Sequence, residues 1–203
     1  MSVPHRNQAA LLLTELAPPG WLLRHSAAVA EIAAFLAERI EARGAAVDRP
    51  LVETAALLHD VDKTLPRDHP LLELGHGQAG AAWLAERGHG ELSAAVAAHP
   101  ATLLTDERRY PRWAAESTLE ERVVAYADKR AMQRIVTLAE RFAEWQERHP
   151  EHAAELRLGL RRAELLEQEV CELAGVTPSE VTRLAWVDAA LHAAGRPMTA
   201  SDR

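Results

Sequence analysis

The chain has 203 residues, which is enough for one domain with its own hydrophobic core. Apolar residues make up 48% of the chain and charged residues 26%, a balance that excludes a disordered protein. The formal net charge of −7 argues against a general nucleic-acid-binding protein, because such proteins turn a basic face to the phosphates.

Apolar residues recur at helical spacing in almost every segment and none alternates like a β-strand, so an all-α fold is predicted. The N-terminal run AALLL is too short for a signal peptide, and no later run reaches the roughly 18 apolar residues of a membrane span. We therefore expect a cytoplasmic protein without a membrane segment. The first half of the chain predicts helices at 7–16, 21–42, 48–60, 76–87 and 91–98.

The second half predicts a long loop at 100–116, of a length typical of lids and binding loops. The capping-box sequence STLE at 117–120 then introduces a helix at 119–129. The remaining helices are predicted at 132–148, 151–174 and 178–194. We expect them to form a helical hairpin on the core, with a dimerisation arm as the alternative. The single cysteine, Cys171, excludes an intramolecular disulfide and a cysteine-rich zinc site.

The stretch GHGQAG at 75–80 spells G-x-G-x-x-G, which in dinucleotide-binding folds follows a strand and opens a helix. Here the preceding LLEL is too short to assign, and the downstream sequence is helical. The glycines are therefore interpreted as a tight approach to a helix that begins at His76. That interpretation moves attention from the glycines to the histidine between them.

Several histidines and one aspartate follow apolar residues at helical spacing, so they point into the predicted bundle. Burying such groups without partners is costly, and a divalent cation satisfies them together. Four histidines and two aspartates exceed the needs of one tetrahedral ion but suit two ions that share a carboxylate. The set consists of His25, His59, Asp60, His76, His99 and Asp128.

In chain order these residues resemble the HD-domain superfamily of metal-dependent phosphohydrolases, whose pattern is H…HD…H…H…D on a helical core. The pattern runs through RHS at 24–26, HDVDK at 59–63, GHG at 75–77, AHP at 98–100 and ADK at 127–129, about half of the sequence. The two middle histidines are typical of the dinuclear branch. Within it the chain looks most like bacterial symmetrical diadenosine tetraphosphate hydrolases, although it has His-Pro rather than His-Thr at His99.

The resemblance implies a single HD-domain helical bundle at 1–203, with a metal-binding core at about 20–132 and a C-terminal helical extension at about 133–196. It also implies that His25, His59, Asp60 and Asp128 hold one metal ion. His76 and His99 hold the second, with Asp60 as the bridge. Mixed imidazole and carboxylate ligands favour iron or manganese first, then cobalt or zinc.

By the same resemblance, the protein is a phosphohydrolase that cleaves a phosphoester or phosphoanhydride bond by means of a hydroxide bridging the metal ions. Asp60 and Lys63 are the expected catalytic residues, because the Lys63 ammonium can offset charge on a phosphate oxygen. Asp62 is interpreted as the cap of a turn. Substrate contacts are expected from Lys63, Arg109, Arg112 and Arg130, with surface salt bridges as the alternative for the arginines.

Other functions stay open at this point. An HD-type di-iron oxygenase uses the same ligand pattern on O₂, and a sensor or scaffold keeps the metal only for folding. The expected partner is a small phosphorylated substrate, by preference a nucleotide, and a homodimer is an open alternative. The histidines at 5, 69, 89, 149, 152 and 192 are assigned no role.

Overall fold

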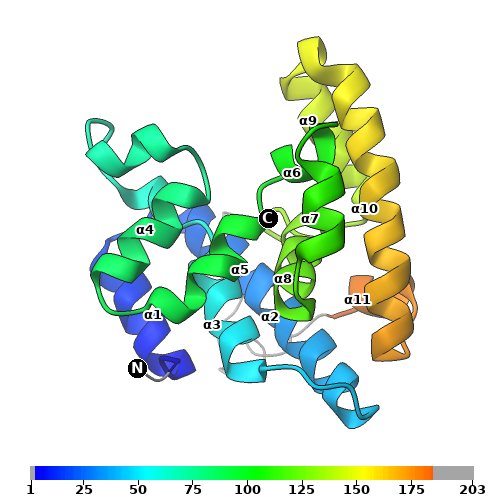
Figure 1. Ribbon diagram of the computed structural model, residues 1–203, viewed down its shortest axis with the longest axis horizontal. Coiled ribbons are helices and arrows are strands. Elements are labelled where there is room, and N and C mark those ends of the chain that lie inside the picture. The colour runs from blue at the N-terminus through cyan, green and yellow to red at the C-terminus, as the bar shows by residue number, and fades with distance from the viewer. Residues whose placement is uncertain (1–2, 185–203) are drawn as a thin grey trace, which may run out of the picture.

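The structure is a computed structural model that describes residues 3–184. Within that range every regular element is an α-helix or a 3-10 helix, which confirms the all-α fold (Figure 1). None of these helices is long and apolar enough to cross a membrane. The α-helices are α1 (Arg6–Glu15), α2 (Gly20–Ala42), α3 (Arg49–Leu58), α4 (Gln78–Glu86), α5 (Ser93–Ala98), α6 (Thr102–Thr105), α7 (Tyr110–Glu116), α8 (Leu119–Lys129), α9 (Leu138–Arg148), α10 (Ala153–Ala174) and α11 (Pro178–Thr182). The 3-10 helices are η1 (Val61–Thr64), η2 (Pro70–Leu74), η3 (Gly90–Leu92) and η4 (Pro150–His152).

The long helix α2 forms the centre of the core, and it packs against α3, α8 and α10 (Figure 1). Its apolar residues recur every three to four positions, so Val29, Ile32, Leu36 and Ile40 are fully buried along one stripe. His25 lies on the same stripe, one turn before Val29. The hydrophobic face of α2 therefore carries a histidine into the interior.

Helices α9 and α10 pack against each other as the predicted C-terminal hairpin, and α10 also lies against α2, α6 and α8 (Figure 1). The approach is close at Gly159, where a β-carbon would lie 2.6 Å from Thr105 Cγ2 and 3.2 Å from Phe142 Cε1. The absence of a side chain at Gly159 thus allows α10 to pack closely against both α6 and α9. Of the predicted helix at 178–194, Pro178–Thr182 form α11, and residues 185–194 lie outside the described residues.

Three local predictions are wrong in detail. The expected loop at 100–116 contains α6 and α7. The helix expected from 132 begins at Leu138, because Thr137 and Glu140 form a capping box there. At the start of α8 the cap is Thr118, which accepts a hydrogen bond from the backbone N–H of Glu121, while Glu120 accepts one from the backbone of Asp48 instead of closing the predicted box.

Arg130 follows α8 and is 1% exposed, so the prediction that it contacts substrate is wrong. Its guanidinium donates to the Tyr126 hydroxyl at 2.6 Å and to Glu167 at 2.5 Å. It also donates to the carbonyl of Pro178 and the hydroxyl of Thr182, the first and last residues of α11. These bonds tie the end of α8 to α10 and α11 and leave no place for a ligand.

Candidate metal centre

Two histidines and two aspartates from three helices meet in the interior. His25 comes from the second turn of α2, His59 and Asp60 directly follow α3, and Asp128 comes from the last turn of α8. The Nε2 atoms of His25 and His59 are 3.1 Å apart, and Asp128 Oδ1 lies 3.2 and 3.5 Å from them. Asp60 Oδ2 is 3.4 Å from both. Ligand atoms about 2.1 Å from a tetrahedral ion are about 3.4 Å apart, so this spacing suits one cation.

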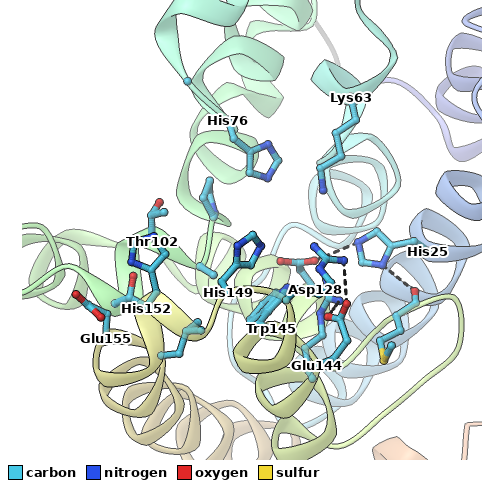
Figure 2. Close-up of a pocket in the computed structure, with 18 of the residues that line it drawn as sticks. His25, Lys63, His76, Thr102, Asp128, Glu144, Trp145, His149, His152 and Glu155 are labelled. Carbon is cyan, nitrogen blue, oxygen red and sulfur yellow. Dashed lines mark hydrogen bonds and ion pairs between the residues drawn. The ribbon is translucent and has the colours of Figure 1, made fainter.

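A second cluster shares Asp60 with the first. The Nε2 atoms of His76 and His99 are 3.1 Å apart, and Asp60 Oδ1 lies 3.4 Å from His76 and 3.6 Å from His99. Figure 2 shows His76 on one side of the site and His25 with Asp128 on the other. The two oxygens of Asp60 therefore face different pairs of histidines. The structure thus brings all six predicted ligands together in two adjacent groups.

The hydrogen bonds of the four imidazoles test whether a cation fits. Each ring has an acceptor at Nδ1: the carbonyls of Met132 for His25, Ala56 for His59 and Val96 for His99, and Asp62 Oδ2 for His76, at 2.6–2.8 Å. A neutral imidazole has one N–H, and Nδ1 uses it, so Nε2 offers only a lone pair. In both clusters two such lone pairs face each other at 3.1 Å, an arrangement that a shared cation satisfies.

The charges of the site favour the same conclusion. Burial raises the pKa of Asp60 and Asp128, but the neighbouring histidines, and for Asp128 the Lys129 ammonium, hold both pKa values well below the usual range. Both carboxylates are therefore ionised although they are buried. Burial lowers the pKa of His59, yet Asp60 and Asp128 outweigh it and raise that pKa to about 9. The two carboxylates thus make the first cluster favourable for a positive charge, which a bound cation would supply.

Lys129 links the two clusters, although no role was predicted for it. It is fully buried, and its ammonium donates to Asp128 Oδ2 at 2.7 Å and to the backbone carbonyl of His99. Burial lowers the pKa of Lys129, and Asp128 opposes that effect. A lysine in the last turn of a helix is usually solvated, so only its place beside Asp128 in the ADK motif hinted at this contact.

Asp62 supports the second cluster rather than capping a turn. Its Oδ2 atom accepts from His76 Nδ1 at 2.8 Å and from the backbone N–H of Gly77 at 3.3 Å. These bonds fix the orientation of the His76 ring and the tautomer that leaves Nε2 free. The interpretation of Asp62 as a turn cap is therefore corrected to that of a residue that positions His76.

The glycine-rich stretch brings His76 to His99 through a close backbone approach. Gly77 has a φ of +81°, and a β-carbon there would lie 2.6 Å from Pro100 Cγ and 3.2 Å from the carbonyl oxygen of Val96. Helix α4 begins at Gln78, so the predicted helix start at His76 is two residues too early. His76 lies in the turn before α4, and the close contact of Gly77 with Pro100 brings this turn next to His99.

Replacing Asp62 by Ala is expected to weaken metal binding at the cluster of His76, His99 and Asp60 by about 10- to 100-fold, because the His76 ring loses its outer partner. Metal binding at the cluster of His25, His59 and Asp128 should be unchanged. Competitive titration with a metal-sensitive dye measures both affinities. Asp68→Ala, at an exposed position of the same loop region, is the control. Equal weakening of both ions by Asp62→Ala would contradict the assignment.

A cavity of about 1030 Å³ opens beside the clusters. On the cluster side it is lined by His25, His76, Asp128 and Lys63, whose ammonium is 2.7 Å from Asp60 Oδ2 (Figure 2). The opposite side includes residues that the sequence analysis did not select: Arg141, Glu144, Trp145, Arg148, His149 and His152. These residues lie far along the chain from the HD motif, so the sequence does not indicate that they line the same cavity.

The predicted substrate arginines divide in the structure. Arg109, just before α7, lines the cavity. The side chain of Arg112 is 82% exposed and pairs with Glu116 at 2.7 Å, outside the cavity wall that the described residues form. Of the four predicted substrate contacts, Lys63 and Arg109 thus border the cavity, whereas Arg112 and Arg130 do not.

Comparison with known proteins agrees with this geometry. The family model described as HD domain matches residues 22–133, more than half of the chain and the part that holds all six clustered ligands. An uncharacterized protein of Methanocaldococcus jannaschii is 36% identical over 113 residues, which are 53% of this chain and 64% of that relative. No solved structure matches the chain. The chain belongs to the HD domain family.

Proposed function

We propose that the protein is a dinuclear metal-dependent phosphohydrolase that cleaves a phosphoester or phosphoanhydride bond in a nucleotide or related small phosphate compound. Membership of the HD domain family supports metal-dependent phosphohydrolase activity in general. The observation that carries the dinuclear assignment is the position of Asp60, whose two oxygens face separate histidine pairs at 3.4–3.6 Å.

The donor set supports transition metals. His25, His59, Asp60 and Asp128 would hold one ion, and His76, His99 and Asp60 the other. Four imidazole nitrogens favour iron, manganese, cobalt or zinc over magnesium or calcium, which prefer oxygen ligands, and iron or manganese is our first choice. Two such ions supply Lewis acidity, which lowers the pKa of water and neutralises charge on phosphoryl oxygens.

The residues of the chain position a substrate at the open side of the clusters. His76 is the exposed member, with 40% of its side chain accessible, whereas His59 and His99 are buried. Lys63 lies beside Asp60 with 38% of its side chain exposed, so its ammonium can turn to a phosphoryl oxygen in the cavity. The positive charge of Lys63 beside a phosphoryl oxygen offsets the negative charge that develops on that oxygen as the phosphate bond is cleaved. Lys63 is therefore the proposed catalytic residue beside the metal ligands.

Metal removal tests this function. Protein purified without oxygen should contain close to two transition-metal ions per chain, a ratio that elemental analysis measures. With manganese or iron it should hydrolyse bis(p-nitrophenyl) phosphate, diadenosine tetraphosphate or members of a nucleotide panel. A chelator should abolish this activity, and the metal should restore it. Protein with two ions per chain that hydrolyses none of these compounds, or that consumes O₂ with an organic substrate and releases no phosphate, would refute the proposal.

A further inference from the structure

The C-terminal hairpin places a polar helix face on the cavity. Arg141, Glu144, Trp145 and Arg148 occupy positions i, i+3, i+4 and i+7 of α9, so they share one face, and all four line the cavity. Figure 2 shows Glu144 and Trp145 near Asp128, with His152 and Glu155 farther along the wall. This face lies after residue 133, outside the matched HD domain.

Arg141 is the least exposed charged residue of this face, and one of its guanidinium N–H groups has no acceptor among the described residues. Its side chain is 13% exposed, and its only side-chain ion pair among the described residues is with Glu144, at 3.2 Å. Its Nε atom is buried without a hydrogen-bond partner in that part of the chain. A buried N–H without an acceptor is costly, so the guanidinium of Arg141 is incompletely satisfied by the chain itself.

Two neighbours fix the guanidinium of Arg141. The Trp145 ring lies 4.3 Å from its central carbon in a cation–π contact, and Phe142 packs against the edge of that ring. Glu144 also pairs with Arg148 at 2.8 Å, so one carboxylate is shared by two arginines. The group therefore keeps a net positive charge while its orientation is held.

The charge of the whole cavity is opposite to that of the protein. Apart from the clustered metal ligands, its charged lining in the described part of the chain consists of four cations and two carboxylates: Lys63, Arg109, Arg141 and Arg148 against Glu144 and Glu155. The chain as a whole carries −7. A local excess of cations in an acidic protein favours an anionic ligand with more than one charge.

We propose that Arg141, oriented by Trp145 and Glu144, binds a phosphoryl group of the substrate other than the one that reacts. This inference rests on the proposed function and narrows its substrate class to compounds with at least two linked phosphoryl groups. A cavity of about 1030 Å³ is at the upper end of small-ligand sites, so it has room for more than one phosphoryl group. The planar fork of the guanidinium suits two phosphate oxygens at once.

Calorimetric binding of two non-hydrolysable probes to the metal-loaded protein tests the role of Arg141. Methylenediphosphonate has two linked phosphonate groups, and methylphosphonate has one. We expect Arg141→Met to weaken methylenediphosphonate binding by about 10- to 100-fold, the effect of losing a charge-assisted contact, and to leave methylphosphonate binding unchanged. Equal weakening of both probes, or of neither, would overturn the inference.

Arg134→Met is the matched control, because Arg134 also pairs with a glutamate of α9 at 3.2 Å but its side chain is 68% exposed. It should bind both probes as the unmodified protein does. Trp145→Leu keeps Arg141 but removes the ring on which its guanidinium stacks. This variant should therefore weaken binding of methylenediphosphonate but not of methylphosphonate, and it serves as the test if Arg141→Met does not fold. Neither probe is hydrolysed, so this binding test does not depend on catalysis. If the diphosphonate is preferred but the protein hydrolyses no phosphate substrate, the proposed function is rejected. If phosphate substrates are hydrolysed but Arg141→Met leaves the binding of both probes unchanged, only this inference is rejected.

Discussion

Asp60→Asn is expected to remove both metal ions and to lower kcat/KM for phosphate substrates by at least about 10³-fold, since Lewis-acid stabilisation of several kcal/mol is lost. Asp60 is buried, and each of its oxygens faces a different histidine pair at 3.4–3.6 Å. An asparagine of the same shape offers only one oxygen and no charge. Elemental analysis of the purified variant, together with steady-state kinetics, measures both effects.

The matched control is Asp128→Asn, which makes the same change in a carboxylate that, of the four histidines, faces His25 and His59 alone. We expect this variant to lose one ion and retain the other at His76 and His99. If Asp60→Asn kept two ions, or if Asp128→Asn lost both, the shared role of Asp60 would be refuted. If Asp60→Asn lost both ions and its stability while the unmodified protein had no turnover to lose, the metals would serve folding alone.

Lys129→Met is expected to lower the free energy of unfolding of the metal-free protein by about 3–5 kcal/mol, the usual result of removing one partner of a buried ion pair. Methionine has a similar shape, so packing is kept while Asp128 and the carbonyl of His99 lose their donor. Urea denaturation followed by circular dichroism measures the change.

Lys63→Met is the comparison for that experiment. Its ammonium is also 2.7 Å from a carboxylate of the centre, but 38% of its side chain is exposed. We expect a stability loss below about 1 kcal/mol, because solvent screens the pair, and a fall in turnover because the cavity loses a cation. Similar stability losses in the two variants would show that burial does not separate their roles.

The inward direction of His25, His59 and Asp128 could be predicted because the helical period reports which side chains face inward. His76 was singled out by the glycine-rich stretch instead, and the division of the six residues between two metal ions followed from the resemblance to the HD-domain superfamily. His25 and Asp128 lie on apolar stripes, and the HD pair follows another, so the sequence alone indicated a common interior point. The fold class followed from the same periodicity. Periodicity within one helix does not show how the helices pack against one another. That packing determines which pair of histidines each oxygen of Asp60 faces.

The roles of the charged residues could not be predicted in the same way. Arg130 and Lys129 are buried because α10, α11 and the turn after His99 bring acceptors to them, and those contacts span up to 52 positions of sequence. Arg141 and Trp145 face the cavity only because the hairpin folds back over the core. An arginine is usually solvated, so its sequence context alone does not reveal a tertiary role. Tertiary contacts bury Arg130 among protein acceptors, and they place Arg141 in the wall of the cavity.

The contact between Gly77 and Pro100 makes two distant positions interdependent. Each residue directly follows a histidine of the second cluster, and the proline ring fills the space into which any side chain at 77 would extend. A smaller residue at 100 would open room for a methyl group at 77, although the positive φ there would still disfavour it. Exchanges at the two positions should therefore compensate one another in relatives of this protein, because together they set the gap that the His76 and His99 rings have to span.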